Sequence, residues 1–184
     1  MTKVFVYGSL MRGLHNSHLL ATSKLVNQRA RTQATDFCLV ACELEKGHPD
    51  EHLSAYGHPS AHYLYPYAIP HERARAGDVR TALRGETYEV QDDVLKLLDE
   101  LEEHPDYYRR EMIPLQDEAD AWIYLLHDED QLAAIRHDAA RATFRAVAPP
   151  GDWRSFMILS APWAVASDLE RFEERNVGKD AGQQ

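Results

Sequence analysis

The chain has 184 residues and carries 30 acidic side chains against 20 lysines and arginines, which gives a formal charge of −10 at pH 7. A chain of this length can bury a substantial core as one domain without a disulfide or a metal. Its negative charge argues against nucleic acid or an anionic membrane as a main partner and leaves small polar molecules as candidate ligands. We find no signal peptide, transmembrane run or basic leader, so we expect a cytoplasmic protein. The sequence does not indicate an oligomeric state.

Strand patterns dominate the first half of the chain. Lys3–Tyr7 is rich in β-branched and aromatic residues and is followed by Gly8 and Ser9, so it predicts a strand that runs into a turn. Cys38 and Cys42 lie in a second strand pattern, and we interpret them as small buried apolar residues rather than a disulfide. This second strand is predicted at Asp36–Cys42. A third is predicted at His62–Ile69, on a sheet edge or at a bulge because it contains Pro66.

The stretch between these two strands, Glu43–Ala61, is polar and irregular and predicts a long loop. This stretch and the residue after it contain two pairs of histidines spaced by four residues, a spacing that zinc sites on helices use. Prolines and a glycine within the stretch exclude a helix that would keep such pairs in register, so we predict neither a metal site nor a cofactor. The histidines are His48, His52, His58 and His62.

The second half of the chain alternates strand and helix patterns. Leu83–Val90 predicts a strand that leads directly into a helix at Asp92–Glu103. We expect one domain over residues 1–160, followed over 161–184 by a C-terminal helix and a frayed tail. The remaining predicted elements are a hairpin of Tyr107–Leu115 and Ala121–His127 with its turn at Glu118–Asp120, a helix at Asp130–Phe144 with an acidic N-cap, and a helix at Ala164–Arg175.

These patterns predict an α+β fold. Strand patterns outnumber helix patterns and are mostly joined by short turns, which favours a mixed, mostly antiparallel sheet over a doubly wound parallel one. We expect this sheet to be closed or nearly closed into a small β-barrel with flanking helices.

One carboxylate of the predicted helix lies on its apolar side. At 100° per residue, five apolar side chains fall within one arc, and Glu102 projects from inside that arc. A carboxylate directed at a core or a pocket wall loses its solvent, which raises its pKa and suits it to proton transfer. The alternative is that Glu102 lies at the edge of the arc and turns outward to water. The arc is formed by Val94, Leu95, Leu97, Leu98 and Leu101.

The turn after the first strand is a second candidate site. After Tyr7, the residues Gly8, Ser9 and Leu10 offer successive backbone N–H groups, and such a turn can form an anion-binding nest. A Gly-Ser turn is commonplace, so the turn alone does not establish an anion site. No G-x-G-x-x-G or Gly-Lys-Ser/Thr motif supports nucleotide binding, and Ser9 lacks the G-x-S-x-G frame of a hydrolase nucleophile.

Two segments of the chain occur in an order that is typical of a known family. They are VFVYGSLMRGLHN and GETYEVQDDVLKLLDELEEHPDYYRREMIPL. Together they resemble the γ-glutamylcyclotransferase superfamily, particularly its γ-glutamylamine cyclotransferase-like branch. In that family a YGSL or YGTL loop ends the first strand, a G-E-x-Y-x-V strand precedes a helix of the form LDxxE, and a Tyr-x-Arg strand follows. The resemblance covers Thr2–Asn16 and Leu83–Leu115 well and Asp36–Ile69 only loosely.

This resemblance implies an enzyme that acts on a small γ-glutamyl substrate without a cofactor. The α-amine of the substrate attacks its own γ-carbonyl, so that 5-oxoproline forms and an amine or amino acid leaves. γ-Glutamylamines and γ-glutamyl-amino acids are favoured over glutathione. By resemblance, the catalytic glutamate is Glu102, the substrate-binding residues are Tyr7, Gly8, Ser9, Leu10 and Tyr108, and Arg110 is treated as structural.

Two other functions are compatible with the same residues. One is a non-catalytic member of the fold that binds a small molecule, and the other is an amide hydrolase. Hydrolysis would need an activated water or nucleophile, which the sequence does not indicate. The motif Gly151-Asp152-Trp153 also resembles a segment near the end of some family members, and its role is left open.

Overall fold

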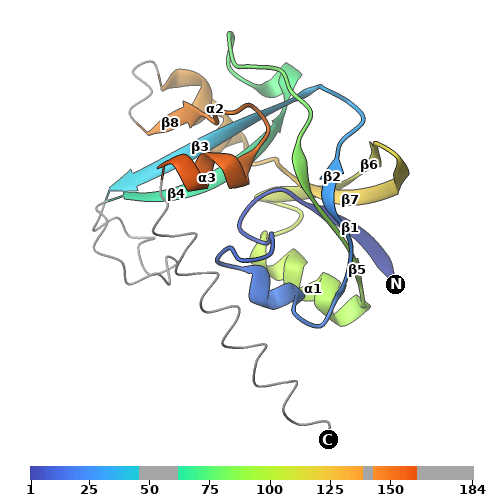
Figure 1. Ribbon diagram of the computed structural model, residues 1–184. Coiled ribbons are helices and arrows are strands. Elements are labelled where there is room, and N and C mark those ends of the chain that lie inside the picture. The colour runs from blue at the N-terminus through green and yellow to red at the C-terminus, as the bar shows by residue number, and fades with distance from the viewer. Residues whose placement is uncertain (46–61, 139–142, 161–184) are drawn as a thin grey trace, which may run out of the picture.

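A computed structural model describes residues 1–45, 62–138 and 143–160 of the chain. Within these ranges lie eight strands, three α-helices and two short 3-10 turns (Figure 1). The strands are β1 Thr2–Val6, β2 Lys24–Arg31, β3 Phe37–Glu45, β4 His62–Pro70, β5 Arg84–Val90, β6 Tyr108–Leu115, β7 Glu118–Leu126 and β8 Phe144–Ala146. The helical elements are η1 Ser17–Leu20, η3 His71–Arg73, α1 Asp92–Leu101, α2 Glu129–His137 and α3 Trp153–Ser160.

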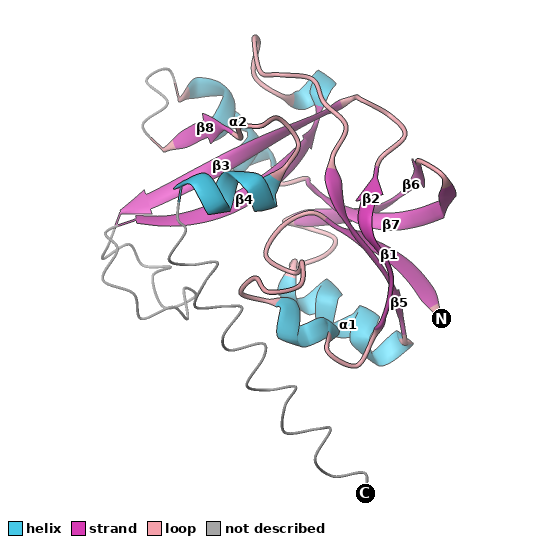
Figure 2. Cartoon of the chain, viewed as in Figure 1, coloured by secondary structure: helices cyan, strands magenta, loops and turns pink. Residues whose placement is uncertain are grey.

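The strands form two sheets (Figure 2). The five-stranded sheet has the order β2-β5-β1-β7-β6, with β1 antiparallel to β5 and parallel to β7. The three-stranded sheet has the order β4-β3-β8 and is antiparallel. The predicted α+β class with a mixed sheet is therefore confirmed, and Pro66 lies on an edge strand as predicted.

The predicted closed barrel is wrong. The edge strands of the larger sheet meet only at one isolated bridge, between Thr32 and Leu115. Two flanking hydrogen bonds, Gln33 N–H to Pro114 O and Gln116 N–H to Arg31 O, complete that contact. Register irregularities in the β2–β5 and β6–β7 pairs add local twist and bring the edges together at this end. A barrel needs continuous staggered pairing around its circumference, which a single bridge does not supply among the described residues.

Helix α1 buries fewer of its apolar side chains than the sequence predicts. Val94 and Leu98 are buried in the core, and the helix lies beside η1 (Figure 1). Leu97 and Leu101, which the helical projection placed in the same apolar arc, are 47% and 39% exposed. Among the described residues, therefore, one side of the arc faces the core and the other side faces solvent.

Several element boundaries differ from the predicted ones. The hairpin turns at Gln116 and Asp117, with β7 beginning at Glu118, because Asp117 adopts a positive φ of 61°. Helix α2 is shorter than predicted: the Asp128 side chain caps it by accepting from the Gln131 N–H at 2.7 Å, and Phe144 belongs to β8. Strands β2 and β8 and helix α3 were not predicted. The predicted helix at Ala164–Arg175 and most of the predicted loop at Glu43–Ala61 lie outside the described residues.

The described helices give no membrane-crossing segment, since none combines the necessary length with the necessary apolar character.

We predict that Leu98→Ala lowers the free energy of unfolding by about 2–5 kcal/mol, because the fully buried side chain leaves a cavity in the core. The matched control is Leu97→Ala on the same helix, which should cost less than about 1 kcal/mol because its side chain is 47% exposed. Urea unfolding of the two variants measures the difference. Equal losses would contradict the observed packing of α1.

Candidate active site

The loop that follows β1 is organised by its own hydrogen bonds. The Met11 N–H donates to Gly8 O at 3.0 Å, and the Asn16 N–H donates to Ser9 O at 2.9 Å. The Asn16 side-chain amide also donates to Ser9 Oγ at 3.0 Å. Within the described residues, the backbone N–H groups of Ser9 and Leu10 donate to no protein acceptor. Consecutive N–H groups of this kind are what an anion nest requires.

Gly8 lets this loop approach the second sheet closely. A Cβ atom at this position would lie 2.6 Å from Cγ of Pro66 in β4, so a larger residue would push the loop away from that strand.

Tyr7 joins the two sheets at the point where β1 ends. Its hydroxyl donates to Tyr124 O in β7 at 3.0 Å and accepts from the Ala68 N–H in β4 at 3.3 Å. Burial raises the pKa of Tyr7 far above its usual range, and the negative charge of Glu102 raises it further. Tyr7 is therefore neutral, and its phenol lies close enough to Glu102 to respond to that charge.

Glu102 is the first residue after α1, and the backbone holds it from both sides. Its N–H donates to Leu98 O at 3.0 Å, and its carbonyl accepts from the Tyr108 N–H at 3.2 Å. The residue is half-buried. The protein atoms around the carboxyl group exclude water and raise its pKa from 4.5 to about 7. This desolvation favours the inward orientation of Glu102 over the outward-turned alternative, although α1 ends one residue before Glu102.

Tyr108 at the start of β6 lies near this carboxyl group and packs against two further tyrosines, Tyr67 of β4 and Tyr107. The Tyr108 hydroxyl donates to Pro66 O at 3.2 Å, and its ring stacks on Tyr67 with centroids 6.1 Å apart. Tyr67 and Tyr107 are joined through their hydroxyls at 3.0 Å. Burial raises the pKa of Tyr108 well above its usual range, with smaller contributions from Tyr7, Tyr67 and Glu102. Tyr108 beside Glu102 is thus uncharged, and the rings of Tyr67 and Tyr107 extend it into an aromatic wall.

Arg110 anchors the end of α1 to the sheet. One guanidinium nitrogen donates to both carboxylate oxygens of Asp99 at 3.0 Å, and the Tyr124 hydroxyl donates to Asp99 Oδ1 at 2.6 Å. The guanidinium also lies 5.2 Å from the ring centroid of Trp122. These contacts support a structural role for Arg110, as the sequence-based interpretation has it.

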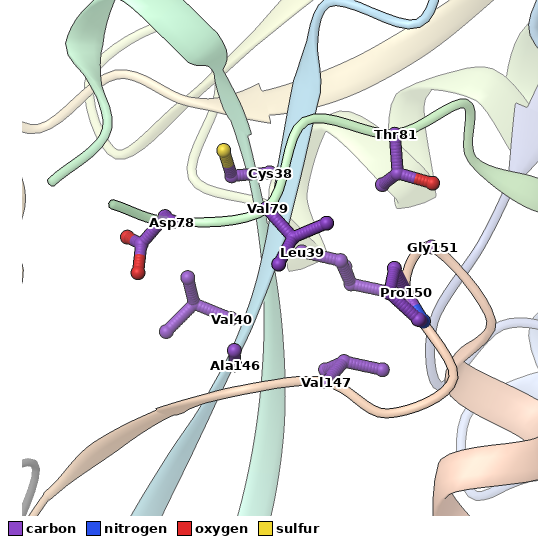
Figure 3. A pocket seen from close by; sticks show the side chains of 10 residues that line it. All are labelled: Cys38, Leu39, Val40, Asp78, Val79, Thr81, Ala146, Val147, Pro150 and Gly151. Atoms are coloured by element: carbon purple, nitrogen blue, oxygen red, sulfur yellow. The ribbon is translucent and has the colours of Figure 1, made fainter. Parts of the chain in front are cut away.

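A separate small pocket lies between β3, the segment 78–81 and the 146–151 connection (Figure 3). Its lining is mainly apolar and includes Cys38 and Asp78. Burial, and then the charge of Asp78, raise the pKa of the Cys38 thiol to about 11, so the thiol stays protonated and is a poor nucleophile. Among the described residues, no cluster of His, Cys, Asp and Glu side chains is arranged to hold a metal ion.

Most of the site residues expected from the sequence lie in one region. The loop Tyr7–Leu10 contacts β4 through Gly8, and Tyr7 and Tyr108 both respond to the charge of Glu102. Sequence reasoning missed Tyr67 and Tyr107, which extend the aromatic wall. The alternation of tyrosines in HYLYPYAI was the available signal for Tyr67, since residues two apart share one face of a strand.

The fold and the site together define an α+β protein with a desolvated carboxyl group beside a backbone loop that offers N–H donors. Comparison with known proteins assigns the family. The family model described as gamma-glutamyl cyclotransferase, AIG2-like, matches residues 4–155, and the chain belongs to this family.

Two relatives agree with that assignment, and one solved structure shares the fold. The protein named "Putative gamma-glutamylcyclotransferase MJ1514" from Methanocaldococcus jannaschii is 32% identical over 129 residues, which are 67% of this chain and 83% of the relative. The protein named "Putative gamma-glutamylcyclotransferase CG2811" from Drosophila melanogaster is 32% identical over 135 residues, 68% of this chain and 70% of the relative. The crystal structure of c4763, a uropathogenic E. coli-specific protein, shares the fold with a TM-score of 0.52 and 21% identity, over 85% of this chain and 94% of that one.

The raised pKa of Glu102 predicts a pH-dependent stability. Between pH 4.5 and about 7 the folded protein binds the Glu102 proton more tightly than the unfolded chain does. The stability that this proton contributes is fully present below pH 4.5 and is lost as the pH rises through about 7. Gln at this position carries no titrating charge. We therefore expect the stability of Glu102→Gln relative to the natural protein to rise between pH 5 and about 8, as measured by urea unfolding at each pH. A constant difference would show that the carboxyl group is not desolvated.

Proposed function

We propose that the protein cyclises a γ-glutamyl amide to 5-oxoproline, with Glu102 as the general acid and base. The observation that carries this proposal is the Glu102 carboxyl group, whose burial raises its pKa to about 7 next to Tyr7 and the following loop. A general base is most effective when its pKa lies near the working pH. Family membership supports the same reaction class.

The α-ammonium nitrogen loses two protons as it becomes the single N–H of 5-oxoproline. Glu102 carries one of them to the leaving nitrogen, and the other passes to the released amine, which is protonated at neutral pH. The α-ammonium group of the substrate is not nucleophilic, so Glu102 removes a proton as the nitrogen attacks the γ-carbonyl carbon. The new bond joins the α-nitrogen to the γ-carbon, and the bond that breaks joins that carbon to the leaving nitrogen. Protonated Glu102 then returns the proton to the leaving nitrogen, so an amine departs rather than an amide anion. No water is consumed.

The loop after β1 supplies the groups that bind the substrate. The N–H groups of Gly8, Ser9 and Leu10 suit the α-carboxylate and can also stabilise the oxyanion that develops on the γ-carbonyl. Held at this end, the extended γ-glutamyl chain folds back so that its amine reaches its own carbonyl. Such positioning contributes a large share of the rate in intramolecular reactions.

The aromatic wall suits the part of the substrate that leaves. Tyr67, Tyr107 and Tyr108 are neutral, so they favour an uncharged portion of the leaving group over a carboxylate. This observation favours γ-glutamylamines among the candidate substrates.

The two alternative functions are less well supported. A pure binding protein gains nothing from a desolvated carboxyl group, which costs stability at neutral pH. An amide hydrolase needs a water or nucleophile activated by a neighbouring base. The Ser9 hydroxyl instead accepts a hydrogen bond from Asn16, which leaves it without a general base among the described hydrogen bonds.

We predict that the protein releases 5-oxoproline and free amine in equal amounts from at least one γ-glutamylamine or γ-glutamyl-amino acid. Glu102→Gln should lower kcat by at least about a hundredfold, because the amide cannot take up the proton. Mass spectrometry of products from a substrate panel measures both. Glu100→Gln, which removes one charge from the exposed side of α1, is the matched control and should retain activity.

The products separate the alternatives. Free glutamate in place of 5-oxoproline would indicate hydrolysis. Binding of a γ-glutamyl compound without turnover would indicate the non-catalytic function. Substantial 5-oxoproline formation by Glu102→Gln would remove Glu102 from the mechanism.

The pH profile gives an independent test. Below pH 7 Glu102 is increasingly protonated and cannot act as a base, so kcat/KM should fall about tenfold per pH unit on the acid side, with an apparent pKa of about 7. Initial rates of amine release between pH 5 and 9 measure this. An acid limb near pH 4.5, the ordinary value for glutamate, would show that burial does not tune the base.

A further inference from the structure

A buried carboxylate that the proposed reaction does not use lies against the same loop. Glu86 in β5 is 3% exposed. It accepts hydrogen bonds from the Arg12 backbone N–H at 2.7 Å, the Tyr88 hydroxyl at 2.8 Å and the Arg154 guanidinium at 3.0 Å. A buried carboxylate that accepts from three donors, one of them in the loop backbone, strongly restricts the position of that loop.

The bond to Arg12 ties the loop to the larger sheet. Arg12 directly follows the turn from Gly8 to Met11, which the Met11 N–H closes by donating to Gly8 O. Fixing the Arg12 N–H therefore restricts the orientation of the preceding peptide groups, including the unpartnered N–H groups of Ser9 and Leu10. A binding site formed by backbone donors depends on such restriction, because its donors cannot adjust by side-chain rotation.

The start of α3 brings Arg154 to Glu86. Gly151 has a φ of 73°, and a Cβ atom there would lie 2.2 Å from Ala82 O, so glycine is required. Its carbonyl accepts from the Arg84 N–H at 2.8 Å, two residues before Glu86. Asp152 then caps the helix by accepting from the Ser155 N–H at 3.0 Å. The buried ring of Trp153 fixes the helix against the core, and the next side chain is Arg154.

The positive charge of Arg154 lies next to the buried negative charge of Glu86. A buried negative charge beside an anion-binding loop would repel the anion, because the low dielectric of the interior strengthens the interaction. Arg154 offsets that charge, since its guanidinium is the only cationic group recorded on Glu86 among the described ion pairs.

We infer that Glu86 and Arg154 are positioning residues for the loop at Tyr7–Asn16, Glu86 by holding its backbone and Arg154 by offsetting the Glu86 charge. The inference rests on the proposed function for the identity of the anion, the substrate α-carboxylate. It gives the motif Gly151-Asp152-Trp153 a role in substrate binding without contact to substrate.

Arg154→Met tests the effect of the charge. This variant leaves Glu86 buried without its cation, so KM for the γ-glutamyl substrate should rise about tenfold while kcat changes less than about threefold. The double variant Glu86→Gln/Arg154→Met removes the charge but keeps an acceptor for Arg12, and it should recover most of the loss in KM. Lys3→Met, which breaks the half-buried ion pair with Glu118 in the same sheet, is the control and should leave KM unchanged.

Hydrogen exchange of the Arg12 amide, followed by NMR, tests the tie to the backbone and needs no turnover. Exchange should be faster in Glu86→Ala than in the natural protein or in Lys3→Met. Should Glu86→Ala not fold, the same measurement is made on Arg154→Met, in which a loosened Glu86 side chain should also speed exchange.

The outcomes distinguish this inference from the proposed function. A natural protein that makes no 5-oxoproline from any γ-glutamyl compound overturns the proposed function, while Arg12 exchange still decides whether Glu86 holds the loop. Unchanged Arg12 exchange overturns the role of Glu86. Unchanged KM in Arg154→Met, or a KM that stays high in the double variant, overturns the role of Arg154.

Discussion

The hydroxyl of Tyr7 is the interaction on which the site depends most. It donates to β7 and accepts from β4, so it fixes the larger sheet to the smaller one at the point where β1 ends. The loop that follows is thereby brought against Pro66, and Tyr108 is brought beside Glu102. Because the hydroxyl is buried and both its partners are backbone groups, its loss would leave two polar groups unsatisfied in the interior.

The burial of the Glu102 carboxyl group destabilises the fold, and interactions at the end of α1 compensate by holding that end in place. Desolvation of Glu102 works against folding at neutral pH, whereas the ion pair of Arg110 with Asp99 and the bond from Tyr124 stabilise the same end of α1. In the proposed reaction, the Glu102 carboxyl group needs a raised pKa to act as a base. The residues that hold its position, Arg110 and Asp99, pair their charges with each other and not with Glu102, whose pKa a neighbouring cation would lower.

Local patterns predicted the local features well. Helical periodicity drew attention to Glu102, whose carboxyl group is desolvated, and strand composition identified β1, β3, β4, β5, β6 and β7. The patterns failed where distant segments decide the structure. Whether the edges of the larger sheet close depends on β2, which alternates weakly in polarity and was missed. Leu97 is exposed because, within the part of the chain that the structure describes, no element packs over that side of α1. Glu86 was missed as well, since its burial depends on Arg12 and Arg154, which are 74 and 68 residues away in sequence.

The outer edge of β4 has a consequence for association with other chains. An exposed strand edge offers free N–H and C=O groups that can recruit a strand from another molecule. Here the Ala68 N–H donates to Tyr7, the Pro66 carbonyl accepts from Tyr108, and proline itself has no N–H to offer. The edge beside the site is therefore closed to strand addition over these residues, so the part of β4 next to Tyr7 and Tyr108 does not recruit a strand from another chain.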